Sequence, residues 1–244
     1  MKNVDSEITD KIVKTVFYID RMVVCFIKKP KGLVELLEGH CDGINTPPIS
    51  DKERTKYKKS ENFKFLSNCY YKLDISQPSK EALEILAGFM KPGRNIEIGH
   101  VITHFEPVMD LVTETEKDAE DVGGYMQERL DHNLAKGKVT EYNEKGTHYW
   151  NNSETDITLV LYSDKPSKVS KKPCVHIEYR FESTDAVHSL GSQFFWVQTI
   201  LELFDEKAFW KGNLKLIDPD SESDDEIENS PFFKTKIKRL ALNL

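Results

Sequence analysis

The chain of 244 residues has no run of apolar residues long enough to cross a membrane, which takes about 18–20 of them in succession. Its first residues, MKNVDSE, are polar and lack the apolar segment of a secretory signal. We therefore expect a protein of the cytoplasm with no membrane partner. The apolar fraction of 39% still allows a sizeable core.

Cysteine is scarce and widely spaced. None of the four residues, Cys25, Cys41, Cys69 and Cys174, forms a CxxC pair, so neither a metal clip nor a redox motif is supported. We expect reduced thiols, with Cys25, Cys69 and Cys174 acting as small hydrophobic residues in strands.

Several catalytic signatures are also absent. The sequence contains no GxSxG, no Walker motif and no HExxH, and the pair Gly123-Gly124 lacks the pattern of a phosphate-binding loop. Hydrolases, nucleotidases and metalloproteases of those classes therefore have no support.

The formal net charge of −7 argues against a general affinity for nucleic acid. Much of it is local, in Asp218, Asp220, Glu222, Asp224, Asp225, Glu226 and Glu228. We predict a folded domain over residues 1–217 and an acidic, disordered tail over 218–244.

The spacing of apolar residues predicts mixed secondary structure. Strands are predicted over 14–27, 66–75, 96–112, 147–150, 156–162 and 174–181. Helices are predicted over 31–37, 78–90, 118–136 and 192–204, and the polar stretch 39–62 is predicted to be a loop. This order predicts an α+β fold with helices on one face of a mainly antiparallel sheet, and two fused ferredoxin- or RRM-like halves stay open as an alternative.

Two strands carry a His-x-Glu pattern. In VITHFEPVMDLV, strand alternation puts His104, Glu106 and Asp110 on one face, and in CVHIEYRF it does the same for His176 and Glu178. Imidazole and carboxylate ligands together suit manganese or magnesium, and zinc less exclusively. If the two strands are neighbours, these side chains converge on a metal. A solvated strand face is the alternative for each pair, and capping of the turn into the next segment is the alternative for Asp110.

Two tyrosines could act as nucleophiles. A tyrosine hydroxyl attacks a phosphodiester when a cation and a metal stabilise the developing charge. Tyr162 leaves its strand on the side opposite Leu159 and Leu161, with Lys165 close by, and Tyr149 is the second candidate. For each tyrosine a packed ring at a strand end is the alternative.

A basic stretch interleaved with aromatics could bind nucleic acid. Its cations are Lys52, Arg54, Lys56, Lys58, Lys59 and Lys64, and its aromatics are Tyr57, Phe63 and Phe65. Such cations can follow a phosphate backbone while the rings stack on bases. Arg180, on the polar face of its strand, is a further candidate. A solvated lysine loop and a cross-strand ion pair are the respective alternatives.

Three segments resemble the replication initiation factors of rolling-circle plasmids and filamentous phages. They are VITHFEPVMDL, THYWNNSETDITLVLYSDKPSK and CVHIEYRF, in that order, and the resemblance covers residues 66–190. The family is similar to the HUH endonucleases, and His176-Ile177-Glu178 is similar to a variant of their two-ligand strand motif. The resemblance implies an origin-specific, metal-dependent nick in single-stranded DNA, a 5′-phosphotyrosine intermediate, a free 3′-hydroxyl and a host helicase as a partner.

Together these observations predict a DNA-nicking replication initiator. Glu106, His176 and Glu178 would hold the metal, with Asp110 and His104 as secondary ligands, Tyr162 as nucleophile and Lys165 as the stabiliser of phosphate charge. A non-catalytic module that binds nucleic acid or a protein partner is the alternative. It is favoured if neither tyrosine can approach the metal-binding face.

Overall fold

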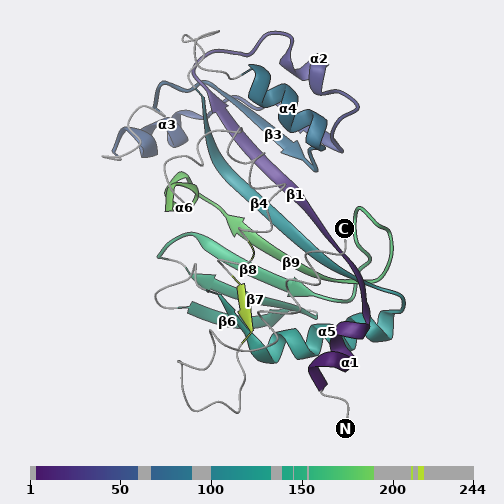
Figure 1. Cartoon of the computed structure of the whole chain (residues 1–244). Coiled ribbons are helices and arrows are strands. Elements are labelled where there is room, and N and C mark those ends of the chain that lie inside the picture. The colour runs from purple at the N-terminus through teal and green to yellow at the C-terminus, as the bar shows by residue number, and fades with distance from the viewer. Residues whose placement is uncertain are drawn as a thin grey trace. The chain divides into compact units, whose positions relative to one another are not determined.

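The computed structural model describes residues 4–59, 67–89, 100–132, 139–144, 146–152, 154–189, 210 and 214–216. The helices there are α1 (Val4–Asp10), α2 (Leu33–Leu37), α3 (Asp51–Lys58), α4 (Lys80–Phe89), α5 (Glu116–Arg129) and α6 (Thr184–Ser189) (Figure 1). The strands are β1 (Ile12–Phe26), β2 (Gly43–Asn45), β3 (Tyr71–Ser76), β4 (His100–Thr113), β5 (Leu130–His132), β6 (Val139–Glu144), β7 (Thr147–Asn152), β8 (Ile157–Tyr162), β9 (Cys174–Phe181) and β10 (Leu214–Leu216).

The strands pair in the order β2-β3-β1-β4-β9-β8-β7-β6, and β5 pairs separately with β10. The β1–β3, β2–β3, β6–β7 and β7–β8 pairs are antiparallel. The predicted α+β class and antiparallel sheet are therefore confirmed. Among the described residues, no helix has the length and apolar character needed to cross a bilayer.

The chain divides into two compact units. Unit 1 comprises Met1–Phe17, Val108–Tyr179 and Glu206–Leu244, and unit 2 comprises Tyr18–Pro107 and Arg180–Asp205.

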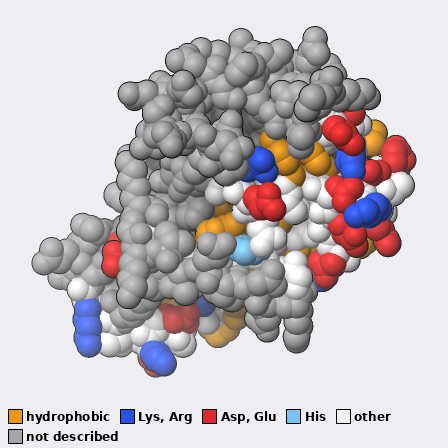
Figure 2. Space-filling model, turned by 90° about the horizontal axis from the view of Figure 1, so that it is seen from below, with side chains coloured by type: hydrophobic (Ala, Val, Ile, Leu, Met, Phe, Trp, Pro, Cys, Tyr) orange, Lys and Arg blue, Asp and Glu red, His pale blue; other side chains and the backbone are white. Residues whose placement is uncertain are grey.

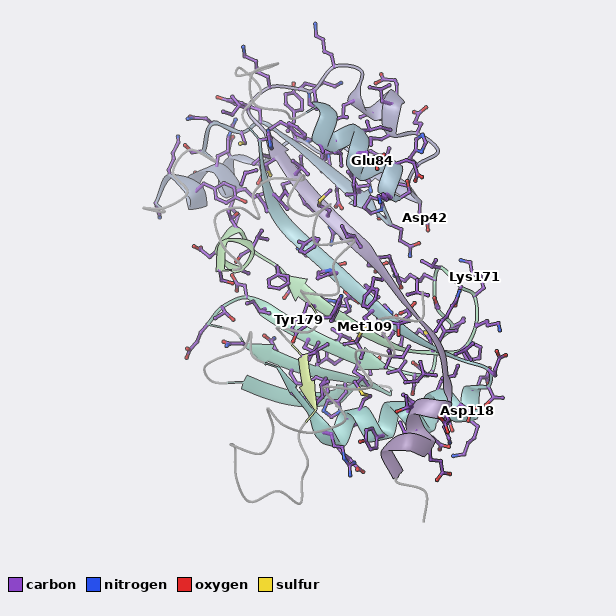
Figure 3. The ribbon with its side chains drawn as sticks, viewed as in Figure 1. Asp42, Glu84, Met109, Asp118, Lys171 and Tyr179 are labelled. Atoms are coloured by element: carbon purple, nitrogen blue, oxygen red, sulfur yellow. The ribbon has the colours of Figure 1, made fainter. Side chains whose placement is uncertain are left out.

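In unit 1, α5 packs on one face of the β7–β9 strands. The helix begins at the N-cap Thr115, whose Oγ1 accepts a hydrogen bond from the backbone N–H of Asp118 at 3.1 Å. Asp118 is labelled at this end of the helix in Figure 3. A Cβ at Gly123 would lie 2.9 Å from the Ser163 Oγ, so a glycine allows the helix to approach the segment that follows β8.

Helix α1 and the start of β1 also belong to unit 1 and contact the exposed side of α5. Lys11 forms an ion pair with Asp121 and lies 3.6 Å from Asp118, and Lys117 bonds Asp121 at 2.7 Å. Acidic and basic side chains also lie next to one another on the coloured surface of Figure 2. Such exposed pairs add little to the free energy of folding, about 0–1 kcal/mol each.

The two faces of β7 and β8 differ in unit 1. Tyr149 lies opposite Val160 in the register, and alternation puts both on the same face as Tyr162. His148 is on the other face, where Gln127 of α5 bonds its ring nitrogen at 2.6 Å. The tyrosines therefore lie on the face that α5 leaves uncovered.

Unit 2 has an apolar face along β1 and β3. Met22 lies opposite Ile75 and Val24 opposite Leu73, and all four are buried. Helices α2 and α4 contact each other and bury further leucines, Leu33, Leu37, Leu83 and Leu86. The opposite face of β1 is polar at Arg21, which forms a bidentate ion pair with Asp74 at 2.7 and 2.9 Å.

Some predicted elements are wrong. The stretch 39–62 contains β2 and α3 instead of being all loop, and α3 begins with a capping box in which Ser50 and Glu53 exchange hydrogen bonds. The predicted helix 118–136 ends at Arg129, and Leu130–His132 forms β5. Strand β6 and helices α1 and α6 were not predicted.

Other predictions lie outside the described residues. The predicted helix 192–204 and the acidic tail 218–244 both do so.

Strand β4 extends through Pro107, the one place inside it where a break could be expected from the sequence.

Candidate functional site

A buried polar cluster in unit 1 is centred on His176 of β9. Its Nδ1 lies 2.8 Å from Oδ1 of Asp110 on β4, and its Nε2 lies 3.1 Å from Oε2 of Glu178, two residues along the same strand. Side-chain exposure is 1% for His176, 0% for Asp110 and 3% for Glu178. The sequence prediction that His176 and Glu178 share a face is consistent with this contact, and Asp110 joins them.

The charges in this cluster are coupled. Burial alone would lower the pKa of His176, but its hydrogen bonds to Asp110 and Glu178 raise the pKa above the ordinary value. The two hydrogen bonds therefore favour the protonated form of His176. Two buried carboxylates facing one imidazole leave an excess of negative charge, which favours a bound cation.

The arrangement fits a divalent ion. Ligand atoms about 2.1 Å from an ion and at right angles to each other are about 3 Å apart, close to the 3.1 Å between His176 Nε2 and Glu178 Oε2. A carboxylate at Nδ1, here Asp110, is the usual partner that orients a metal-binding histidine. The buried Oδ2 of Asp110 has no hydrogen-bond partner among the described residues, so a further donor or cation would be favourable beside it.

Tyr162 lies against this cluster. Its ring stacks on the His176 ring, with centroids 4.3 Å apart and an interplanar angle of 20°. The Nζ of Lys165 lies 5.0 Å from the centroid of the Tyr162 ring, within the range of a cation–π contact. Tyr162 is half-buried and Lys165 is exposed. A tyrosine, a cation and a possible ligand pair thus lie together in unit 1.

Tyr149, the second candidate nucleophile, is half-buried on β7. It lies opposite Val160, and Tyr162 follows two positions along β8 on the same face. Tyr162 has the ring contact with His176, so it is the stronger of the two candidates.

The second His-x-Glu pair lies in unit 2, in the first half of β4. His104 Nε2 lies 2.6 Å from Glu106 Oε1. An oxygen of Asp20 on β1 lies within 4.8 Å of one of Glu106, and Asp20 accepts a hydrogen bond from Gln77 at 3.1 Å. Sequence reasoning missed Asp20. Its signal was the charged pair Asp20-Arg21 within the otherwise apolar run VFYIDRMVVCF.

The residues predicted to bind nucleic acid are mostly on α3 in unit 2. Lys52, Lys58 and Lys59 are exposed there. The Arg54 guanidinium lies 4.8 Å from the ring centroid of Tyr70, which is 52% exposed. The Lys56 side chain lies outside the described structure, as do Phe63, Lys64 and Phe65. Arg180, also in unit 2, is half-buried on β9.

A pocket of about 260 Å³ opens on the inner side of α3 in unit 2. Its lining includes Arg21, Val23, Glu53, Tyr57, Lys72, Thr103, His104, Glu182, Ser183, Thr184 and Asp185. Lys72 and Glu53, which both line the pocket, form an ion pair. Positive and negative groups are mixed, so the pocket has no single charge preference.

The similarity of this chain to known proteins is weak. No protein-family model matches the chain. No curated protein matches it either. Among solved structures it is similar to a rolling circle replication initiator protein from Geobacillus stearothermophilus, at 10% identity, over 93% of this chain and 96% of that chain, with a TM-score of 0.49. A likeness this weak carries no argument about either fold or activity.

Proposed function

We propose that this protein nicks single-stranded DNA at a replication origin through the hydroxyl of Tyr162, in a metal-dependent reaction that starts rolling-circle replication. The observation that carries the proposal is the stacking of Tyr162 on His176 at 4.3 Å, beside a histidine and a carboxylate spaced like neighbouring ligands of one ion. The exposed Lys165 next to the same ring adds the positive charge that phosphate chemistry needs.

For the metal we propose manganese or magnesium, held by Glu106, His176 and Glu178. Asp110 would orient His176 through Nδ1, and His104 would orient or join Glu106, its hydrogen-bond partner at 2.6 Å. The mixed imidazole and carboxylate donors suit these ions. When bound, the ion would neutralise charge that develops on the phosphate.

The reaction exchanges one phosphodiester for another. The hydroxyl oxygen of Tyr162 forms a bond to phosphorus, and the bond between phosphorus and the 3′ oxygen breaks. The phenolic proton is lost to solvent and the leaving 3′ oxygen takes up a proton, giving a 5′-phosphotyrosine and a free 3′-hydroxyl. Lys165 stabilises the added negative charge on the phosphate in the transition state.

Further cations would hold the DNA strand. We propose that Lys52, Arg54, Lys56, Lys58 and Lys59 of the α3 region and Arg180 of β9 contact its phosphates. Such contacts add affinity without reading sequence. A host helicase would then unwind the duplex, and the reaction would take place in the cytoplasm.

The test is formation of a covalent protein–DNA adduct. Purified protein, manganese and a pool of labelled single strands from the replicon that encodes it should give an adduct on a denaturing gel. Tyr162→Phe should abolish it, Glu178→Gln should reduce it strongly, and Tyr149→Phe should leave it intact. An adduct lost only in Tyr149→Phe would mean that Tyr149 of β7, and not Tyr162, is the nucleophile.

A second candidate is a module that binds nucleic acid or a protein partner without cleaving. It is favoured by the engagement of both His176 nitrogens by carboxylates, which makes the cluster a self-contained structural element. Calorimetry separates the two functions. Absence of manganese binding, with single-stranded DNA still bound and no adduct formed, would support this candidate.

A further inference from the structure

The loop between β8 and β9 in unit 1 has a closed, ordered backbone. The N–H of Ser167 donates to the carbonyl of Lys172 at 2.9 Å, and the N–H of Lys171 donates back to the carbonyl of Ser167 at 2.9 Å. Ser167 Oγ also accepts from the N–H of Ser170 at 3.0 Å, and the Ser167 residue is 1% exposed. Pro166 and Pro173 form a bridge at the base. The loop therefore holds one shape before any ligand arrives.

This closed loop displays lysines. Lys165, Lys168, Lys171 and Lys172 are all exposed, in a protein whose formal net charge is −7. Lys171, labelled in Figure 3, has a left-handed backbone with φ of 60°. Val169 at the turn is 52% exposed. The basic loop, as we call residues 165–172, thus combines local positive charge with one exposed apolar side chain.

We propose that the basic loop binds the sugar–phosphate backbone of single-stranded DNA, next to the nicking centre. The placement rests on the proposed function: Lys165 lies over the Tyr162 ring at 5.0 Å, so a strand bound at Tyr162 continues directly onto the loop. Lysines spaced along an open surface match a regular row of phosphates, with Val169 available to contact a sugar or base. A preformed loop also reduces the entropy lost on binding.

The exposed lysines of the basic loop are complementary in charge to a phosphate backbone, and an acidic peptide is the competing ligand that the test separates. Lys172 also pairs with Glu114 at 3.1 Å. Phosphate contacts of this kind are independent of sequence and release counterions, so they have a defined salt dependence. That dependence gives the proposal a quantitative test.

The experiment measures binding without cleavage. In a Tyr162→Phe background, fluorescence anisotropy gives the Kd of a labelled oligo(dT) at several salt concentrations. The loop variant combines Lys168→Gln with Lys171→Asn, because asparagine tolerates a left-handed backbone. The matched control combines Lys14→Gln with Lys31→Gln, two exposed lysines elsewhere that remove the same charge.

Loss of two phosphate contacts should make the negative slope of log K against log salt shallower by about 1.4. It should also raise the Kd roughly 10- to 30-fold at about 0.1 M salt. Lys168→Arg with Lys171→Arg should restore binding, and the control pair should change the Kd less than about 3-fold. Equal effects of the loop and control pairs would overturn the proposal, because net charge alone would then explain them. A loop that binds an acidic peptide but not oligo(dT) would overturn it as well.

Failure of this inference and failure of the proposed function are distinguishable. An active nickase whose loop variant binds oligo(dT) normally would retain the function and overturn the loop assignment. A protein that never forms an adduct, yet loses oligo(dT) affinity in the loop variant, would retain the loop assignment and overturn nicking.

Discussion

The pattern His-x-Glu occurs in both units, on β9 and on β4, with different surroundings. In unit 1, His176 and Glu178 have side-chain exposures of 1% and 3%, and Asp110 binds the second ring nitrogen. In unit 2, the His104 and Glu106 side chains are 15% and 11% exposed. The same three-residue spacing therefore gives a cluster with a directly bonded third partner in one place, and in the other a slightly more exposed pair with Asp20 within 4.8 Å of Glu106.

The two pairs therefore differ in burial and in how closely a third partner is bound. A buried carboxylate needs a compensating charge or hydrogen bonds, because the protein interior solvates it poorly. His176 supplies that compensation in the absence of a metal, and a cation can replace its proton. At His104 and Glu106, solvent also helps to stabilise the carboxylate. We therefore expect unit 1 to be the more sensitive to substitution.

The largest expected effect comes from replacing the two histidines separately. If the proposed function holds, His176→Gln should lower the rate of adduct formation about 100-fold or more, because it removes a proposed metal ligand and the ring on which Tyr162 stacks. His104→Gln should lower it less than about 10-fold, as expected for a residue that orients another ligand. Initial rates in manganese measure both. Equal losses would mean that the two pairs are equivalent.

Asp110→Asn tests the third partner. It should weaken manganese binding about 10- to 100-fold, the usual effect of changing a group that orients a metal-binding histidine. Isothermal titration calorimetry measures the Kd, and circular dichroism checks the fold. Glu114→Gln, an exposed carboxylate in the same unit, is the control and should leave the Kd unchanged. Unchanged binding in Asp110→Asn would remove Asp110 from the site.

Two neighbouring glycines of α5 test how unit 1 supports Tyr162. An added Cβ at Gly123 meets the Ser163 Oγ at 2.9 Å, whereas at Gly124 nothing lies within 4 Å. Gly123→Ala should lower the free energy of unfolding by about 1–3 kcal/mol. Gly124→Ala should raise it by up to about 1 kcal/mol, through helix propensity. Urea denaturation measures both, and a neutral Gly123→Ala would show that Ser163 moves freely.

The smallest expected effect concerns unit 2 and pH. Burial raises the pKa of Glu53, but hydrogen bonds from Lys72 and Ser50 outweigh it and hold the pKa at about 2, against an ordinary 4.5. Because the folded-state value is the lower one, the stabilisation is present above about pH 4.5 and is lost as pH falls toward 2. Glu53→Gln should flatten the stability curve in that window.

The effect on Glu53 should be modest, since its side chain is 35% exposed and solvent screens the pair. Thermal denaturation at several pH values measures it, with Asp51→Asn on the same helix as the control. Asp51 is 90% exposed, so this control should change the curve less. An unaltered curve in Glu53→Gln would show that the Lys72 contact does not persist in solution.

The β-branched and aromatic composition of the strands predicted much of the fold, but alternation did not predict burial, because both faces of β9 are buried, including His176 and Glu178. The predicted strand 174–181 coincides with β9. Helix α3 was missed because its composition is polar throughout, although Ser50 and Glu53 have the spacing of a capping box. Strand β5 was missed because its pairing with β10 joins segments far apart in sequence, and local periodicity contains no such information.

The candidate site was predictable only within each strand. Alternation placed His176 beside Glu178, and it placed Tyr162 on the side away from Leu161. The contact between Asp110 and His176 joins residues 66 positions apart, and the Tyr162–His176 stacking joins different strands. Both depend on strand order, which a single sequence does not specify.

Because three of the four thiols are buried, the fourth, Cys41, can be labelled selectively. Desolvation raises the pKa of Cys25 to about 11 and those of Cys69 and Cys174 to about 12, so their reactive thiolate forms are rare near neutral pH. Cys41 is partly exposed. A maleimide dye should therefore react first at Cys41 in the natural sequence. That provides a fluorescent reporter on unit 2 without engineering a cysteine.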